Sequence, residues 1–460
     1  MIPPRLRWLV EPGSPARQLG ERFNSAGYRL FLVGGSVRDA FLDRNHEDLD
    51  FATDALPATT KDVLSGWADA IYPVGEIYGT IGALKGELRF EVTTLRAEVY
   101  REESRKPHVA YTDDIQTDLS RRDFTVNAIA LEVPELAPID PFGGLADLAG
   151  RSLRTPLAPE VSFSDDPLRM LRLFRFQATL DFIPDAEAVA SAMAMGDRLE
   201  IVSAERIRDE LSKLLVAPAP SVALTGLVDT GLLVRFLPEL PALAMEQDPV
   251  HRHKDVLAHT LAVVDKTSPR LELRLAALLH DIGKPATRSF GAKGASFHHH
   301  EVVGAKMARA RLRHLHYPRT IIDHVNALVS LHLRPHTLPM GWTDSAVRRY
   351  VTDAGPYLDD LNELVRCDVT TANPKRAGEI QQRIDDLEGR ISELSVREEL
   401  SRLRPPIDGH RVMELLGIGP GPQVGEIMDL LYERRIEEGP YSEEEATRFV
   451  LEWAQKRGIT

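Results

Sequence analysis

The sequence predicts an α+β protein, with an N-terminal α/β head followed by all-helical domains. Short apolar runs alternate with helical patterns only in the first third of the chain, and helical periodicity dominates from Asp165 onward. A chain of 460 residues is also too long for one hydrophobic core. The expected parts are a head at residues 20–155, a helical neck at 156–245, a second helical domain at 250–375 and a helical tail region at 376–460.

The composition is that of an ordinary globular protein, with 43% hydrophobic and 27% charged residues. No apolar run is long enough to span a bilayer, and the N-terminal stretch lacks an export signal. Cys367 is the single cysteine, which fits a reducing cytoplasm, and we expect a cytoplasmic protein without a membrane partner. The net charge of -13 argues against a uniformly basic nucleic-acid binder but leaves room for a local basic groove.

The head begins with a predicted strand at Tyr28–Val33, which Gly34 and Gly35 interrupt before a helical segment. A strand at Asp48–Thr53, a helix and two more strands at Ile81–Lys85 and Leu88–Leu95 follow. In the first of these, Asp48 and Asp50 flank Leu49, so alternation places both carboxylates on one face. Paired carboxylates suit Mg²⁺, which supports in-line attack on a phosphoryl group. Alone, this tripeptide is common at strand ends.

Further residues strengthen this prediction. Glycines between a strand and a helix let backbone amides approach a triphosphate, and Arg38 lies one turn into that helix. Glu91 on a later strand offers a third carboxylate, although a solvated strand residue would look the same.

The head and neck carry an ordered set of motifs: LVGGSVRD, DLDFAT, EVTTLR, LSRRDFTVNAIA, IDPFGGLADL, DDPLRMLRLFRF and SAERIRDEL. This set resembles that of class II tRNA nucleotidyltransferases of the DNA polymerase beta superfamily. The resemblance implies that Asp48 and Asp50 bind metal and that Glu91 is the additional acidic residue. It also implies that Gly35, Arg38, Arg121 and Arg122 contact the triphosphate of the nucleotide. Gly34 lies beside these contacts. The structural alternative for the two last arginines is a solvated loop or an ion pair with Asp118 or Asp123.

The segment SDDPLRMLRLFRF predicts a helix that Ser164 or Asp165 caps, with Pro167 in its first turn. Asp166 and Arg169 would then be neighbours on one helix face. In the related families this motif reads E-D-x-x-R, so Asp165 departs from the pattern at its first position. Arg172 and Arg175 continue at three-residue steps, as expected for phosphate and base contacts. The alternative is a surface helix with an Asp–Arg salt bridge and a basic stripe.

An Asp/Arg pair can select nucleotides without a template. Cytosine and adenine both present an amino donor beside a ring-nitrogen acceptor, which match the Asp166 carboxylate and the Arg169 guanidinium. Uracil and guanine present a carbonyl oxygen instead, at a cost of about 1–3 kcal/mol for the unsatisfied acceptors. The loop with Arg101, Arg105 and Lys106 resembles the full loop of enzymes that add the final A as well as both Cs.

Histidines gather in the second half, with twelve of the fifteen between His251 and His336. The order His, His-Asp, Asp resembles the HD superfamily of metal-dependent phosphohydrolases. This resemblance implies four metal ligands, and two further histidines, His300 and His332, could complete a second metal or bind phosphate. A mixed imidazole and carboxylate shell favours a first-row transition metal, without fixing which one. The alternative is a satisfied core pair. The four expected ligands are His259, His280, Asp281 and Asp368.

The leading hypothesis is template-independent transfer of CMP and AMP from CTP and ATP to the 3′ end of tRNA, with release of pyrophosphate. It requires Mg²⁺ in the head. At the HD site we expect a second divalent metal, which would support a phosphohydrolase activity. The alternatives are a polyadenylating relative and a metal-dependent HD phosphohydrolase whose head only binds nucleotides. A non-catalytic RNA-binding module has no use for clustered acidic ligands. The sequence makes no prediction of the oligomeric state.

Overall fold

The computed structural model divides the chain into two compact units, Met1–Phe236 and Leu237–Thr460. The first boundary thus falls before the neck end expected at residue 245, and the division into four domains stays a prediction. Each unit is described by itself. The described residues are 3–45, 49–75, 79–99, 108–245, 255–291, 294–337, 342–369, 374–398, 400 and 403–459.

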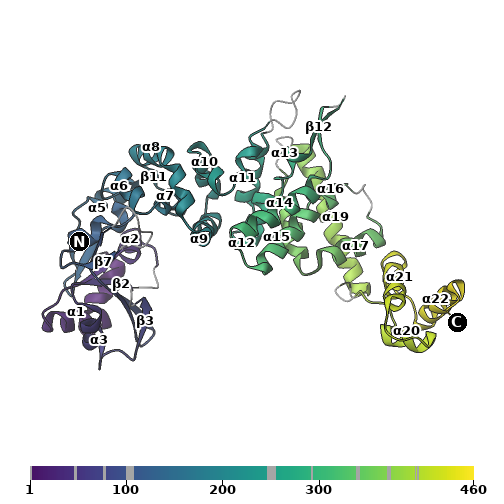
Figure 1. The fold of residues 1–460 in the computed structure, drawn as a ribbon, viewed down its shortest axis with the longest axis horizontal. Coiled ribbons are helices and arrows are strands. Elements are labelled where there is room, and N and C mark those ends of the chain that lie inside the picture. The colour runs from purple at the N-terminus through teal and green to yellow at the C-terminus, as the bar shows by residue number, and fades with distance from the viewer. Residues whose placement is uncertain are drawn as a thin grey trace. The chain divides into compact units, whose positions relative to one another are not determined.

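A seven-stranded sheet with the order β3-β4-β5-β2-β1-β8-β9 forms the centre of the head (Figure 1). Only the β2–β5 pair is parallel, and it lies in the middle of this order. The strands are β1 (Leu30–Val33), β2 (Leu49–Thr53), β3 (Ala70–Gly75), β4 (Thr80–Lys85), β5 (Leu88–Thr94), β8 (Ala130–Val133) and β9 (Ala137–Ile139). A separate hairpin pairs β6 (Arg96–Val99) with β7 (His108–Tyr111).

The strand, glycine turn, helix and strand predicted at the start of the head are present, and β3 is a strand that the sequence pattern did not indicate. All four residues of β1 are buried. Phe31 of β1, Ala52 of β2 and Ala130 of β8 share one hydrophobic cluster with Leu119 of α4 (Ile115–Ser120). The packing of this cluster holds β1 and β2 in place.

Helices fill the rest of the first unit. Among them, α7 contacts α9 and α10, and most of its buried residues are apolar. The helices are α1 (Pro15–Ser25), α2 (Gly35–Phe41), α3 (Pro57–Leu64), α4 (Ile115–Ser120), α5 (Gly144–Gly150), α6 (Pro159–Asp165), α7 (Leu168–Leu180), α8 (Ala186–Ala194), α9 (Ala204–Leu215) and α10 (Pro220–Asp229), with short 3₁₀ turns η1 (Pro4–Val10), η3 (Thr125–Asn127), η4 (Gly196–Ile201) and η5 (Leu233–Arg235).

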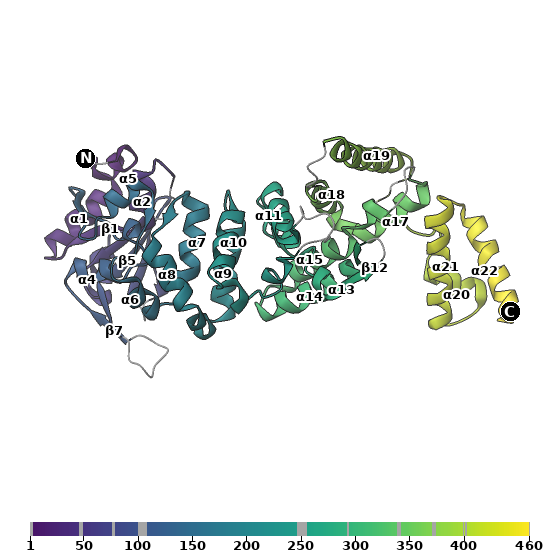
Figure 2. The same ribbon diagram turned by 90° about the horizontal axis from the view of Figure 1, so that it is seen from above.

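Within its described residues, the second unit is helical apart from one hairpin of β12 (Arg288–Gly291) and β13 (Gly294–Phe297) (Figure 2). This hairpin departs from the helices expected after Asp165. The short strand β11 (Ile183–Pro184) in the first unit, which pairs with β10 (Ser152–Leu153), departs from that expectation as well. The helices are α11 (Val256–Lys266), α12 (Leu271–Leu279), α13 (Lys284–Thr287), α14 (His300–His314), α15 (Arg319–Leu331), α16 (Arg334–Thr337), α17 (Asp344–Ala354), α18 (Leu358–Cys367), α19 (Pro374–Glu398), α20 (Gly409–Leu416), α21 (Pro422–Glu438) and α22 (Glu443–Arg457), with turns η6 (Pro241–Leu243) and η7 (Gly355–Tyr357).

The last three helices have a hydrophobic core of their own, which includes Val412, Leu431 and Trp453. In the described part of the chain, no helix combines the length and apolar character that a bilayer-spanning segment requires.

Candidate active site and metal centre

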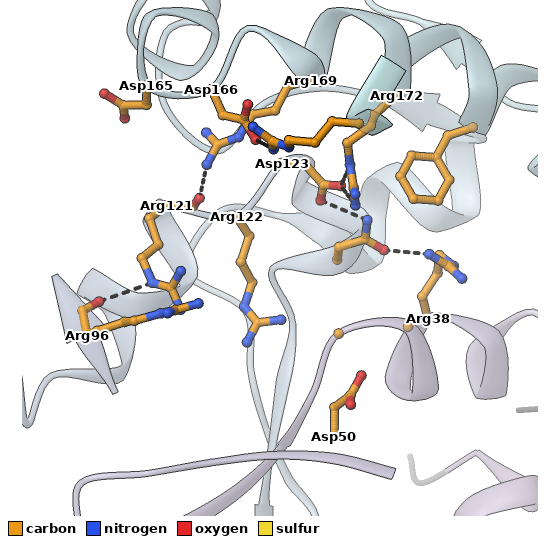
Figure 3. Close-up of a pocket in the computed structure, with 15 residues that line it drawn as sticks. Arg38, Asp50, Arg96, Arg121, Arg122, Asp123, Asp165, Asp166, Arg169 and Arg172 are labelled. Carbon is orange, nitrogen blue, oxygen red and sulfur yellow. Dashed lines mark hydrogen bonds and ion pairs between the residues drawn. The ribbon is translucent and has the colours of Figure 1, made fainter. Parts of the chain in front are cut away.

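A cavity of about 640 Å³ lies in the first unit, where the ends of β1 and β2 face α7 and α9 (Figure 3). Seven arginines and four aspartates line it, so a chain of net charge -13 has a local excess of positive charge at this place. Such an excess favours the binding of phosphate groups. The lining residues are Gly34, Gly35, Arg38, Asp50, Arg96, Arg121, Arg122, Asp123, Asn127, Asp165, Asp166, Arg169, Arg172, Phe176 and Arg206.

Asp50 and the glycine bend form one wall of the cavity. Gly34 directly follows β1 and has φ +77° and ψ −138°, a conformation that side chains other than glycine rarely adopt. A Cβ atom built on Gly34 would lie 3.8 Å from Asp50 Oδ2 and 3.1 Å from Arg122 Nη1. The bare backbone therefore leaves the space between a carboxylate and a guanidinium open.

Glu91 lies beside Asp50, because the two residues are direct partners in the parallel β2–β5 ladder. Their side chains therefore leave the same face of the sheet, although Glu91 is not among the residues that line the cavity. Asp48, the other predicted ligand, lies outside the described residues. Among the described residues of the predicted metal site, the carboxylate of Asp50 is therefore the group in the cavity that could hold a divalent cation. Carboxylate oxygens are the ligands that Mg²⁺ prefers.

Arg121 and Arg122 follow α4 and both contact the buried Asp118. Arg121 Nη2 lies 2.7 Å from Asp118 Oδ1, and Arg122 Nη2 lies 3.3 Å from Oδ2. Burial raises the pKa of Asp118, but the two guanidinium charges outweigh it and lower the pKa. Two cations against one carboxylate leave a positive charge, and the buried Nε of Arg122 has no hydrogen-bond partner among the described residues. The expected ion pair with Asp118 therefore holds both guanidinium groups at the cavity wall.

Asp166 lies between α6 and α7 rather than on a helix face. Its backbone is extended, with φ −141°, and its Oδ1 accepts a hydrogen bond from Leu168 N at 3.2 Å. The predicted capping by Ser164 or Asp165 is therefore wrong, because both residues belong to the last turn of α6. Asp166 and Arg169 therefore do not share one helix face, but they remain neighbours, since Arg169 N donates to Asp166 O at 3.0 Å and both line the cavity. Their joint role in base selection stays a prediction.

Arg169 also lines the cavity, and three hydrogen bonds from its guanidinium hold the side chain in place. Its Nη1 donates to Ser162 O at 3.2 Å and to Ser162 Oγ at 2.9 Å, and its Nη2 donates to the carbonyl of Arg121. Figure 3 shows Arg169 directed toward Arg121, with Asp50 on the opposite side of the cavity. Arg169 thus ties α7 to the loop that carries the two adjacent arginines.

A chain of polar contacts runs along the far wall. Arg38 Nη1 donates to Asn127 Oδ1 at 2.8 Å, Asn127 donates to Asp123 Oδ1 at 2.9 Å, and Arg172 Nε donates to Asp123 Oδ2 at 2.9 Å. Burial raises the pKa of Asp123, but Arg172 and the hydrogen bonds lower it to about 2. Arg175 does not line the cavity. Its Nε donates to the buried Glu210 of α9, so the geometry gives its predicted nucleotide contact no support.

A second cluster of titratable groups lies in the second unit. It joins His259 of α11, His280 and Asp281 after α12, His300 at the start of α14, His332 after α15 and Asp368 after α18. Two groups of three have ligand atoms within 4.8 Å of one another, namely His259, His280 and Asp368, and Asp281, His300 and His332. All four predicted ligands and both additional histidines thus meet at one place.

The histidines of this cluster are oriented as metal ligands are. The Nδ1 atoms of His280, His300 and His332 lie 2.7, 2.8 and 2.7 Å from the carbonyls of Ala277, Phe297 and Val329. Nδ1–H donation to a carbonyl leaves the Nε2 lone pair free to bind a cation. The buried Nε2 atoms of His300 and His332 have no hydrogen-bond partner in the described part of the chain, as expected of nitrogens that bind a metal ion.

The pKa values of two histidines in the cluster are shifted in opposite directions. Burial alone would lower the pKa of His280, but Asp281 and Asp368 raise it to about 10. Burial and repulsion by His280 lower the pKa of His332 to about 3, so this ring is neutral, the form that binds metals. A bound cation would take the place of that proton beside the two carboxylates, because metal ligation requires the neutral form of His280.

Comparisons with known proteins match both the first and the second unit. Residues 30–154 match the family described as "Poly A polymerase head domain", residues 181–243 match "Probable RNA and SrmB- binding site of polymerase A", and residues 256–373 match "HD domain". An A-adding tRNA nucleotidyltransferase of Deinococcus radiodurans is 33% identical, with 92% of this chain and 95% of that protein covered. The chain belongs to the tRNA nucleotidyltransferase family. A CC-adding tRNA nucleotidyltransferase of Thermus thermophilus is 31% identical over 92% of this chain and 93% of its own length.

Among solved structures, the CCA-adding enzyme of Bacillus stearothermophilus in complex with CTP is similar at a TM-score of 0.69 and 25% identity. The match covers 96% of this chain and 98% of that one. The predicted family, fold class and enzyme class of this tRNA nucleotidyltransferase are therefore confirmed. The related proteins carry the names of A-adding, CC-adding and CCA-adding enzymes, which does not favour the polyadenylating alternative.

The cavity of the tRNA nucleotidyltransferase also contains six residues that sequence reasoning did not select. All six lie within the quoted motifs, so a signal was present for each: EVTTLR contains one of them, LSRRDFTVNAIA two, DDPLRMLRLFRF two and SAERIRDEL one. Tertiary packing brings these motifs together at the cavity. The six are Arg96, Asp123, Asn127, Asp165, Phe176 and Arg206.

Gly34→Ala tests the bend beside Asp50. The positive φ and the approach to Arg122 predict a free energy of unfolding lower by about 1–3 kcal/mol. Because the added methyl group enters the space facing Asp50, we expect kcat/KM for nucleotide incorporation to fall roughly 10- to 100-fold. Thermal unfolding and initial rates measure the two effects. Gly66→Ala, which also has a positive φ but nothing within 4 Å, is the control and should lower stability only.

Gly283→Ala tests the packing that brings His300 to Asp281. A Cβ atom on Gly283 would lie 2.2 Å from the carbonyl of His300 and 2.7 Å from Gly304 N, so α14 must move away. His300 Nε2 is 3.4 Å from Asp281 Oδ1, and this approach would be lost. We expect the purified variant to retain less divalent metal per chain in elemental analysis. Gly389→Ala adds the same methyl group in open space and should leave the metal content unchanged.

Proposed function

We propose that this protein adds CMP and AMP from CTP and ATP to the 3′ end of tRNA and so builds or repairs the CCA end. The observation that carries the proposal is the single cavity in which Asp50, a glycine bend and an excess of arginines meet. The full-length similarity to A-adding and CC-adding relatives supports it. The partners are thus the tRNA 3′ end, CTP and ATP, and a reducing cytoplasm is the proposed location.

Asp50 would hold Mg²⁺ in this reaction, with Asp48 and Glu91 as the further carboxylates. When bound, the ion supplies charge stabilisation for in-line attack of the tRNA 3′-hydroxyl on the α-phosphorus of the nucleotide. Arg121 and Arg122, which both line the cavity, would bind the triphosphate and neutralise the departing pyrophosphate. The glycine bend keeps side chains out of the space that the phosphates need.

Asp166 would select the base. Its carboxylate lines the cavity and accepts the exocyclic amino group that cytosine and adenine share. Uracil and guanine would place a carbonyl oxygen against it, and two acceptors without a proton between them cost about 1–3 kcal/mol. Selection of C and A therefore needs no nucleic-acid template.

The test is incubation with a tRNA that ends at the discriminator base, with each labelled nucleotide alone and in combination. We expect two C residues with CTP, one further A when ATP is added, and no extension with UTP. Addition of A only to a tRNA ending in CC identifies an A-adding enzyme, and arrest after two Cs identifies a CC-adding enzyme. A growing A tail identifies the polyadenylating alternative, and UTP use equal to CTP use contradicts the role of Asp166. The loop with Arg101, Arg105 and Lys106, which favours full CCA addition, lies outside the described residues.

A second candidate activity is hydrolysis of a phosphate ester at the HD site. It is supported by two adjacent groups of His and Asp ligands, with Asp281 in contact with His280 and His300 at 3.2 and 3.4 Å. The imidazole-rich ligands favour first-row transition metals. Metal-dependent release of phosphate from p-nitrophenyl phosphate tests this activity, and its absence with Mn²⁺, Co²⁺, Ni²⁺ and Mg²⁺ contradicts it.

A further inference from the structure

A buried aromatic ring lies among the charged residues of the head cavity. Phe176 of α7 is 4% exposed, and the other described residues that line the cavity are arginines, aspartates, one asparagine and two glycines. The guanidinium carbons of Arg38, Arg172 and Arg175 lie 5.3, 5.6 and 4.0 Å from the centre of its ring. A cation within about 6 Å of a ring is attracted by the negative charge of the ring face. Three such contacts distinguish Phe176 from an ordinary core residue.

Arg38 reaches this ring from α2, directly after the glycine bend. Its Nε and Nη2 donate to Asp39 at 2.8 and 2.9 Å, and its Nη1 donates to Asn127 at 2.8 Å. A guanidinium has five N–H donors, so a group held in this way still has donors for phosphate oxygens. The hydrogen bonds hold the ends of the guanidinium, and the contact with Phe176 places its central carbon against α7.

Arg172 reaches the ring from the same helix. Arg172 and Phe176 are four residues apart on α7, so their side chains are neighbours on one helix face. Arg172 lines the cavity, and its Nε donates to Asp123 Oδ2 at 2.9 Å. Arg175 lies closest to the ring but does not line the cavity. The ring therefore joins two cavity arginines that come from different helices.

Charge balance does not account for the ring. Each of the three guanidinium groups has a carboxylate partner of its own, so the positive charges are neutralised without an aromatic residue. What the ring adds is a further contact that restricts where two of these groups can lie. The three carboxylates are those of Asp39, Asp123 and Glu210.

We propose that Phe176 is a positioning residue for the triphosphate of the incoming nucleotide, because its cation–π contacts hold the guanidinium groups of Arg38 and Arg172 at the cavity wall. Figure 3 shows both arginines on the side of the cavity away from Arg96. This role deepens the proposed function and rests on it. Because the ring acts on phosphate contacts and not on the base, the preference for CTP over UTP should not depend on it.

The test replaces Phe176 in the full-length protein with 4-fluoro-, 3,5-difluoro- and 3,4,5-trifluorophenylalanine. Fluorine withdraws electron density from the ring face and changes the shape of the ring little, so the attraction for a cation falls step by step along the series. We expect the KM for CTP to rise with each fluorine, by roughly 3- to 10-fold in total, while kcat stays within about twofold of the wild-type value. The Kd of inorganic tripolyphosphate, measured by calorimetry, should rise in the same proportion, and the CTP:UTP ratio of kcat/KM should not change.

The matched control is the same series at Phe124. This ring is fully buried and packs edge-on against Phe176 with 5.6 Å between the ring centres, and none of the described guanidinium groups lies over it. Its fluorination should change neither the KM for CTP nor the Kd of tripolyphosphate.

A KM and a Kd that stay at their wild-type values throughout the Phe176 series overturn the proposal. An equal rise in the Phe124 series overturns it as well, because the effect would then come from ring packing and not from attraction of the cations. A wild-type protein that incorporates no nucleotide contradicts the proposed function itself. The Kd of tripolyphosphate requires no turnover and still decides the role of Phe176, which separates the two failures.

Discussion

Asp50→Asn is expected to lower kcat for nucleotide incorporation by roughly 10³-fold, because the neutral amide no longer anchors the cation that stabilises the departing pyrophosphate. A metal ion at a phosphoryl centre contributes several kcal/mol, and each 1.36 kcal/mol is a factor of ten in rate. The substitution keeps the shape of the side chain on β2, so the unfolding temperature should change little. Single-turnover incorporation of CMP into tRNA, with and without saturating Mg²⁺, measures the effect.

The matched control is Asp43→Asn, which removes the same charge from a side chain that is 84% exposed and contacts Arg5. It should leave incorporation at the wild-type rate. The same Asp50→Asn protein should keep its HD metal content, since that cluster lies in the other compact unit. Incorporation that survives in Asp50→Asn would contradict a catalytic head and would favour a head that only binds nucleotides.

The head could be predicted because its functional groups lie close together in the sequence. Strand alternation places Asp50 on one face of β2, and the glycine pair directly follows β1, so local rules were sufficient. The region around Asp166 was less predictable, because this extended residue separates α6 from α7 and so does not share a helix face with Arg169. Helical periodicity cannot show such an interruption between two apolar segments.

Contacts across long sequence separations account for the remaining differences. Arg206 is 40 residues from Asp166, and their contact depends on the packing of α9 against α7. The HD ligands come from five elements, yet their order along the chain was recognisable because each residue type is chemically distinctive. What the sequence did not show is the close approach of Gly283 and Gly304, which places His300 beside Asp281.

Substitution of single HD ligands is expected to have an effect of similar size on the second site. His259 belongs to one group of three ligands and His332 to the other. If each group holds an ion, His259→Ala and His332→Ala should each lose about one metal ion per chain and keep the other. If the two groups share a single ion, either substitution should leave the protein without metal. Even the loss of residues that only orient a ligand weakens metal binding about 10- to 100-fold, so loss of a ligand should exceed this.

The measurement is metal per chain by elemental analysis after dialysis, together with p-nitrophenyl phosphate hydrolysis. Hydrolysis should fall more than about 100-fold in either variant, while CMP incorporation by the head stays at the wild-type rate. His314→Ala removes an exposed histidine of α14 and should alter neither quantity. Among the described residues, Nε2 of His332 is buried without a hydrogen-bond partner, and its ring is neutral, as a metal ligand requires. Unchanged metal content in His332→Ala would therefore contradict a second ion and leave the cluster as a site for one.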